Sequence, residues 1–224
     1  MSLIESDNDS SVFWRQLDIV SPAKLALIKP TMIGVGGLGS PTAMGLAKMG
    51  VKEFTIYDDD VVDEHNAPNQ MYSLLDIGRP KVDAITEVIE SMGGGVTKKQ
   101  ERYLGQNLSD MVIVTVDNML GRSRVWDKVK HNPNVPLLID ARMGAEEGRI
   151  FAINPRDEEH IKLYENSLYS DEEAVELPCT AQAIIYNTFM IGALVCRLVK
   201  GFANSENLPR EITLDSIMYQ IYIR

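Results

Sequence analysis

Four glycines near the N-terminus form the most chemically suggestive pattern in the chain. They are Gly34, Gly36, Gly37 and Gly39. They lie between a short apolar run, residues 32–33, and a segment with helical periodicity, residues 40–47. A strand that turns through glycines into a helix brings backbone N–H groups and the positive end of the helix dipole close to a phosphate. Gly34 suits the tight turn, Gly36 leaves room for the phosphate, and Gly39 lets helix and strand pack closely. The pattern predicts a nucleotide site.

An acidic residue follows the next apolar run at the distance expected of a ribose ligand. Asp58 comes directly after residues 53–57, about 20 positions past the glycines, where a dinucleotide fold places its ribose-binding carboxylate. A solvated turn acid is the alternative. A P-loop requires a lysine directly after its last glycine, and Ser40 stands there instead. The P-loop is therefore excluded, whereas NAD and ATP both remain compatible with these residues.

Further motifs follow in order along the chain. They are Asp58-Asp59-Asp60, Asn66-Ala67-Pro68-Asn69-Gln70, Gly78-Arg79-Pro80-Lys81 and Asp117-Asn118. With the glycines, this series resembles the ThiF/MoeB family, the adenylating domain shared with ubiquitin-activating enzymes. That family's pattern runs GxGGxGS, Asp-x-Asp, Asn-x-x-Arg-Gln, Gly-x-Pro-Lys and Asp-Asn, and the match covers residues 12–153. The resemblance implies an ATP-dependent adenylyltransferase that converts the C-terminal carboxylate of a small ubiquitin-like or sulfur-carrier protein to acyl-AMP, releasing pyrophosphate.

Two charged residues at expected element boundaries suit this reaction. A carboxylate attacking the α-phosphate of ATP needs cations to neutralise the developing charge, and Lys81 supplies one at the start of a predicted helix. The helix dipole disfavours a cation there, which favours a functional role over a solvated lysine. Asp117 follows a predicted buried strand and is a candidate ligand for Mg²⁺, which prefers carboxylates, phosphates and waters. Helix capping is the alternative role for Asp117.

The resemblance also assigns further contacts to the nucleotide. The candidates are Asp58, Asp60, Asn66, Asn69, Gln70 and Asn118. Asp58 resembles the ribose ligand, and Asn66 and Gln70 are expected to bind phosphates or brace the loop. Asn69 stands where the family carries arginine, so one cation is missing. This substitution keeps a non-catalytic, nucleotide-binding scaffold open as an alternative, beside an oxidoreductase that uses NAD.

Two other arginines are candidates for the missing cation. Arg15, within Phe13-Trp14-Arg15-Gln16, resembles a segment that in relatives reaches the nucleotide of the neighbouring subunit, so the resemblance implies a homodimer. An exposed helix arginine is the alternative for Arg15. Arg122, shortly after the Asp-Asn motif, is the second candidate.

The chain contains two cysteines, and one of them is a candidate nucleophile. Cys179 precedes a predicted long helix, whose dipole would stabilise the thiolate. Relatives place a thioester-forming cysteine in a similar Cys-Thr context, so an acyl-adenylate can pass to Cys179. A small buried apolar residue is the alternative, and it is the expected role of Cys196. Two cysteines provide neither a disulfide framework nor a Cys₄ zinc site, which favours a reducing compartment.

Composition narrows the class of protein. The 224 residues are 45% hydrophobic and 24% charged, which is ordinary for a soluble protein. A net charge of −10 argues against nucleic-acid binding, which needs concentrated Lys and Arg. Residues 183–199 are too short and too polar to span a bilayer, and residues 1–11 lack a signal-peptide core. We expect a cytoplasmic protein with a flexible N-terminus over residues 1–11 and a single domain over residues 12–224.

Apolar runs alternate with helical patterns, which is typical of βα units. The expected strands are residues 31–35, 53–57, 111–116, 137–140, 149–153 and those within 211–224, and the expected helices are residues 39–49, 81–91, 119–131 and 181–200. Residues 154–180 are expected to be an irregular crossover or lid. These elements predict an α/β fold: a Rossmann-like doubly wound, mostly parallel sheet with an additional antiparallel strand region on the C-terminal side.

Overall fold

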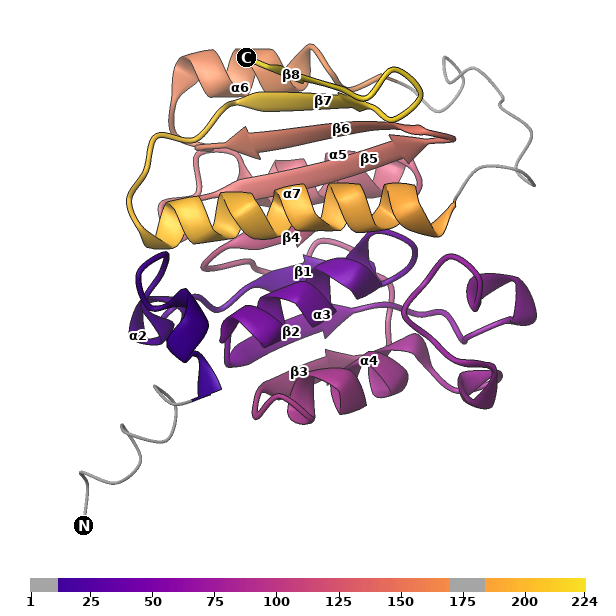
Figure 1. Ribbon diagram of the computed structural model, residues 1–224. Coiled ribbons are helices and arrows are strands. Elements are labelled where there is room, and N and C mark those ends of the chain that lie inside the picture. Colours follow the sequence, from indigo (N-terminus) through magenta and orange to yellow (C-terminus); the bar gives the residue numbers. More distant parts are fainter. Residues whose placement is uncertain (1–11, 170–183) are drawn as a thin grey trace.

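The computed structural model describes residues 12–169 and 184–224, which form an eight-stranded mixed sheet (Figure 1). The strands run in the order β3-β2-β1-β4-β5-β6-β7-β8. Their bounds are β1 Thr31–Ile33, β2 Glu53–Tyr57, β3 Gly95–Lys99, β4 Val112–Val114, β5 Leu138–Gly144, β6 Glu147–Ile153, β7 Glu211–Asp215 and β8 Gln220–Ile223. Neighbouring strands from β3 through β2, β1 and β4 to β5 pair in parallel, and those from β5 through β6 and β7 to β8 pair antiparallel. The predicted doubly wound sheet with an antiparallel C-terminal side is confirmed.

Helices cover both faces of the sheet. They are α2 Pro22–Ala26, α3 Gly39–Met49, α4 Lys81–Glu90, α5 Met119–Val129, α6 Glu158–Glu165 and α7 Ile185–Ala203. One apolar cluster joins one face of the sheet to α3, α4 and α7, and a second joins the other face to α5 and α6. In Figure 1, α3, α4 and α7 accordingly lie in front of the sheet and α5 behind it.

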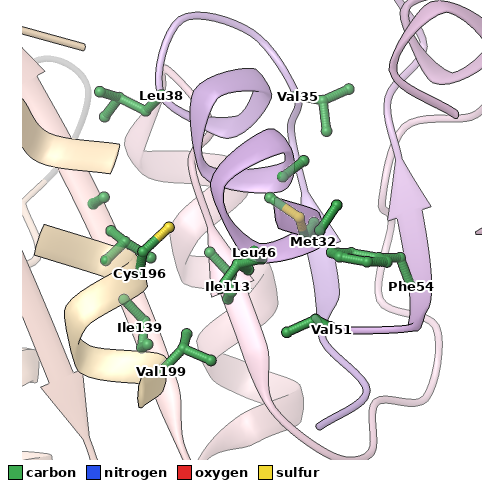
Figure 2. Packing of buried hydrophobic residues seen from close by; sticks show 14 of the residues in the cluster. Met32, Val35, Leu38, Leu46, Val51, Phe54, Ile113, Ile139, Cys196 and Val199 are labelled. Atoms are coloured by element: carbon green, nitrogen blue, oxygen red, sulfur yellow. The ribbon is translucent and has the colours of Figure 1, made fainter. Parts of the chain in front are cut away.

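Helices α3 and α7 pack closely side by side over the sheet. A Cβ at Gly45 would lie 2.7 Å from Cys196 Sγ, and one at Gly192 would lie 3.4 Å from Pro41 Cβ. Figure 2 shows Cys196 on α7 beside α3, close to Leu46. Burial raises the pKa of the Cys196 thiol to about 12. This cysteine is therefore a core residue, as predicted.

The parallel strands all end at one edge of the sheet, on the right in Figure 1. The turn after β1, the segments after β2 and β4, and the N-termini of α3 and α5 meet there, as the geometry of parallel βα units requires. Residues 12–26 lie at the opposite edge (Figure 1). There the Phe13 ring lies 3.5 Å from a Cβ built at Gly50, the C-cap residue that follows α3.

Two elements differ from the sequence-based expectation. Strand β3 was missed because it is an exposed strand with two lysines and no apolar alternation. The expectation of irregular structure from residue 154 is wrong for Glu158–Glu165, which forms α6. Asp157 caps this helix through bonds to the N–H groups of Glu159 and His160, and Tyr164 buries its ring fully. The helix is short and amphipathic, and the acidic residues on its exposed face made the segment resemble an irregular surface loop.

Among the described helices, α7 is long and apolar enough to cross a membrane by length and composition. Half of its most apolar window is buried inside the protein, and a single helix of this kind is weak evidence for a membrane span. Predicted residues 181–183 of this helix lie outside the described residues, as does the expected flexible segment 1–11.

Candidate active site

The turn between β1 and α3, residues 34–39, is called the glycine loop. Gly34 has φ +92°, a left-handed conformation that glycine adopts without strain. Its N–H donates to Tyr57 O at 2.9 Å, and its carbonyl accepts from Thr115 Oγ1 at 2.7 Å. A Cβ at Gly39 would lie 2.2 Å from Gly34 O. The turn therefore requires glycine at its first position and at the start of α3.

The backbone N–H and carbonyl of Val35, the next residue of the loop, both form hydrogen bonds with buried side chains. Val35 N–H donates to Asp58 Oδ2 at 2.8 Å, and Val35 O accepts from the Tyr72 hydroxyl at 2.6 Å. Ser40 Oγ donates to Gly36 O at 2.8 Å and accepts from Met71 N–H at 3.0 Å. The segment around residues 71–72 is thereby fastened onto the loop.

The remaining N–H groups of the loop are unpaired within the described part of the chain. They belong to Gly36, Gly37, Leu38 and Gly39, at the start of the eleven-residue helix α3. The atom nearest to a Cβ built at Gly36 is Gln70 Nε2 at 3.9 Å, and at Gly37 it is Thr188 Cγ2 at 3.8 Å. Unpaired N–H groups, open space and a helix N-terminus are together the features that an anion site requires.

A chain of polar contacts leads from the loop to a buried lysine. Asp58 Oδ1 accepts from Asp60 N–H at 2.9 Å, and Asp60 Oδ2 pairs with Lys81 Nζ at 2.8 Å. The pairing of Val61 with Pro80 brings the two segments together. Burial raises the pKa of Asp58, an effect that the N–H groups of Val35 and Asp60 only partly offset. The structure thus joins three of the predicted residues, Asp58, Asp60 and Lys81.

The Asp117-Asn118 pair lies at the same edge, directly after β4. Asn118, not Asp117, caps α5, since its Oδ1 accepts from Gly121 N–H at 2.7 Å. Asn118 Nδ2 also donates to Asp117 Oδ1 at 2.9 Å. The Asp117 side chain is exposed, and its Oδ2 has no protein partner among the described residues. A carboxylate with a free oxygen beside an anion site fits a ligand of Mg²⁺.

The amide residues of the second motif divide into two roles. Asn66 is buried and accepts from Asp63 N–H at 3.0 Å, so it braces its own turn. The buried side-chain oxygens of Asn69 and Gln70 have no hydrogen-bond partner in the described part of the chain. A buried carbonyl without a donor is costly, so these two amides fit a bound group that carries hydrogen-bond donors.

Two predicted arginines are not brought to the glycine loop. Arg15 is exposed at the opposite edge, its guanidinium 5.3 Å from the centre of the Trp14 ring. The guanidinium of Arg122 is buried and pairs with Asp140 at 3.1 Å; it is therefore committed inside the protein, and the suggestion that it replaces the missing phosphate cation is not supported. Cys179 lies outside the described residues.

Sequence reasoning missed several residues that shape the loop. Ser40 belongs to the GxGGxGS motif and Tyr72 follows the asparagine-glutamine motif, so both were open to detection. Met143 of β5 and Thr188 of α7, which approach Gly37, come from segments without a motif. Only the folded chain brings them there.

Fold and site together define a doubly wound α/β protein with a nucleotide-type glycine loop. The chain belongs to the ThiF family, whose model matches residues 10–218. It is 27% identical over 194 residues to the sulfur carrier protein ThiS adenylyltransferase of Escherichia coli, covering 80% of this chain and 75% of that enzyme. It is 32% identical over 134 residues to the SAMP-activating enzyme E1 of Haloferax volcanii, covering 54% of this chain and 49% of that enzyme.

Solved structures carry the same fold. PaaA superposes with a TM-score of 0.77 at 17% identity, over all of this chain and 75% of PaaA. Escherichia coli MccB crystallised with ATP superposes with a TM-score of 0.72 at 17% identity, over 91% of this chain and 65% of MccB. The predicted family membership is confirmed, and the predicted adenylylation agrees with the names of the matched relatives, which are adenylyltransferases and activating enzymes.

Proposed function

We propose that this chain uses ATP to adenylate the C-terminal carboxylate of a small ubiquitin-like or sulfur-carrier protein. The observation that carries this proposal is the convergence, at one sheet edge, of the unpaired N–H groups of the glycine loop, the Lys81 ammonium and the Asp117 carboxylate. The substrate class is supported by the named relatives, which act on ThiS and on SAMP.

Each residue then has a physical role. The glycine-loop N–H groups bind phosphate oxygens, and Asp58 both braces the loop and accepts from ribose hydroxyls. Lys81 neutralises charge that develops at the α-phosphate. Asp117, steadied by Asn118, holds Mg²⁺, which supplies positive charge to the phosphates when bound. The carbonyls of Asn69 and Gln70 accept donors of the bound nucleotide.

A homodimer accounts for the position of Arg15. The segment that carries it, residues 12–26, lies at the edge of its own subunit opposite the glycine loop (Figure 1), so Arg15 can serve a nucleotide only in a neighbouring copy. We therefore assign Arg15 to the partner's site, where it replaces the cation that Asn69 does not supply. We also retain a single domain over residues 12–224, with residues 154–180 as its crossover, and a cytoplasmic location.

ATP–pyrophosphate exchange tests the reaction, with ThiS or a ubiquitin-like protein as carrier. We expect carrier-dependent exchange that is lost in Lys81→Ala and Asp117→Ala. Lys98→Ala is the matched control, because Lys98 pairs with Asp83 at 2.6 Å away from the glycine loop. Tight binding of NAD without ATP would refute the proposal and restore the oxidoreductase alternative.

A non-catalytic scaffold is the second candidate. The observation that favours it is the absence, within the described residues, of an arginine guanidinium bonded to the glycine loop. The same exchange assay decides between the two. A parent protein that binds ATP but exchanges no pyrophosphate with any carrier is a scaffold.

Thioester transfer to Cys179 is a separate part of the proposal. The thiolate attacks the acyl-adenylate carbonyl, the carbonyl carbon–oxygen bond to AMP breaks, and AMP leaves with the electron pair. We expect a thiol-sensitive adduct between enzyme and carrier that disappears in Cys179→Ser and persists in Cys196→Ser. An adduct that survives Cys179→Ser would exclude this role.

A further inference from the structure

A buried ionic cluster lies behind the candidate active site, between β5, α5 and α6. Asp140 is fully buried. It pairs with Arg122 Nε at 3.1 Å and Arg142 at 2.8 Å, and accepts from the Tyr164 hydroxyl at 2.9 Å. Alternation along β5 places Asp140 and Arg142 on the sheet face that α5 and α6 cover. The mechanism above uses none of these groups.

The two arginines hold different parts of the chain. Arg142 donates to Ser167 O at 2.8 Å and to Ser167 Oγ at 3.0 Å. Its guanidinium lies 4.7 Å from the centre of the Phe151 ring. Burial would lower the pKa of Arg142, but the Asp140 carboxylate and Tyr164 raise it overall. Arg142 therefore already provides Asp140 with a charged partner, and a second buried arginine is not needed for neutrality.

Arg122 instead bonds to the backbone at the N-terminus of α5, next to Asp117. Its Nη1 donates to Asn118 O at 3.2 Å and its Nη2 to Ala141 O at 3.4 Å. Asn118 is the cap of α5, and its side chain donates to Asp117 Oδ1 at 2.9 Å. An unbroken series of bonds thus runs from buried Asp140, through Arg122 and Asn118, to the Asp117 carboxylate.

The location of this guanidinium is electrostatically unfavourable by itself. The N-terminus of α5 carries partial positive charge, which repels a cation in the first turn, and burying an ion requires its desolvation. Asp140 offsets both effects. A buried ion pair adds little stability over apolar residues of the same size. The pair with Asp140 does, however, fix the Arg122 guanidinium against two backbone carbonyls, Asn118 O and Ala141 O.

We propose that the Arg122–Asp140 pair is a positioning device for Asp117. It sets the backbone at Asn118, and through Asn118 it orients the Asp117 carboxylate toward the glycine loop. The inference rests on the proposed function only in taking Asp117 as a metal ligand. Arg122 and Asp140 are positioning residues that act through Asn118.

The test measures metal binding rather than turnover. Mn²⁺ is titrated by electron paramagnetic resonance into the full chain with α,β-methylene-ATP, which cannot be cleaved at the α-phosphate. We expect Arg122→Lys, which keeps the charge but loses the fork, to weaken Mn²⁺ binding about 10–100-fold, as the loss of outer-shell partners does. Affinity for ADP without metal should change less than about threefold, because Arg122 does not contact the glycine loop.

Glu211→Gln is the matched control. It breaks another carboxylate–arginine pair, that of Glu211 with Arg149 at 2.5 Å, in the antiparallel half of the sheet. Its thermal stability should fall while its Mn²⁺ affinity stays that of the parent. Equal weakening in the control, or unchanged binding in Arg122→Lys, would overturn the proposal. So would a parent whose complex binds Mn²⁺ no better than the free nucleotide does.

Asn118→Ser covers the case in which Arg122→Lys fails to fold. Serine still caps a helix but has no amide to donate to Asp117. We expect parent-like thermal stability with Mn²⁺ binding weakened to the same degree as in Arg122→Lys, and parent-like Mn²⁺ binding would reject the inference. If the parent catalyses no pyrophosphate exchange but the Mn²⁺ affinities of the variants change as expected, adenylylation is refuted while the positioning role is supported.

Discussion

Lys81 and Asp60 form an ion pair of 2.8 Å in which the lysine side chain is 8% exposed and the aspartate 61%. The ammonium is thus fixed and its partner borders solvent. Asp60 also donates its N–H to Asp58, which in turn holds Val35. A continuous series of polar contacts therefore connects the Lys81 ammonium, through Asp60 and Asp58, to the backbone of the glycine loop.

The unequal exposure of this pair predicts unequal effects of substitution. Lys81→Ala removes the charge that we propose neutralises the α-phosphate and should lower the exchange rate about 10²–10³-fold. Asp60→Asn should lower it less than about tenfold, because an exposed charge contributes little to such a pair. Exchange kinetics at saturating ATP provide the comparison. Equal losses would show that the pair, rather than the ammonium, is required.

Two glycines of the loop should respond differently to alanine. A Cβ at Gly39 meets Gly34 O at 2.2 Å, so Gly39→Ala should lower the free energy of unfolding by about 1–3 kcal/mol through overpacking. A Cβ at Gly36 meets nothing nearer than 3.9 Å, so Gly36→Ala should fold normally and lose nucleotide affinity. Urea unfolding and ATP binding separate the two effects. A Gly36→Ala protein with parent affinity would place the phosphates elsewhere.

The raised pKa of Asp58 gives nucleotide binding an acidic limit. Burial favours the protonated carboxyl, so protonation on acidification begins above the ordinary pKa of 3.8. A protonated Asp58 loses the negative charge that strengthens its bonds from Val35 N–H and Asp60 N–H, and the brace on the loop weakens. ADP affinity should therefore fall on acidification from about pH 7 to about pH 4.

Asp58→Asn is the control for this limit. An amide supplies one acceptor oxygen at every pH, so this variant should bind ADP weakly and keep only the pH dependence of the ADP phosphates. A parent curve of the same shape as the variant's would remove Asp58 as the cause.

The end of α7 provides a test of stability against pH. Bonds from Lys200, and then from Arg197 and Asn204, lower the pKa of Glu206 from 4.5 to about 2. A carboxylate with a lowered pKa stabilises the fold above its unfolded-state pKa and loses that contribution as pH falls. The melting temperature of Glu206→Gln should therefore be below that of the parent at neutral pH. The difference should vanish between pH 4.5 and about 2.

Glu101→Gln, at an exposed position with no ion pair among the described residues, is the control for Glu206. Its melting temperature should track that of the parent across the same range. A Glu206→Gln difference that persists at the lowest pH would point to lost packing instead of lost charge.

Most of the sheet was predictable because its buried strands and the helices between them carry regular apolar periods. Strand β3 was not, since its lysines face solvent and its pairing with β2 is specified by backbone bonds. For the site, the motifs predicted Asp58 and Lys81, but not the contact of each with its neighbours. The role of Arg122 was also beyond sequence reasoning, because its partner Asp140 is brought to it by parallel pairing of β4 with β5.

The packing of α7 on α3 has a consequence for biosynthesis. Helix α3 emerges from the ribosome before α7, so the apolar face that the two helices share stays uncovered until Ile185–Ala203 has been translated. Strand β6 likewise waits for β7, its second neighbour, which follows that helix. Contacts so distant along the chain form late and slowly. Until then the nascent chain exposes apolar surface of α3 and of the sheet, and such exposure favours binding by chaperones.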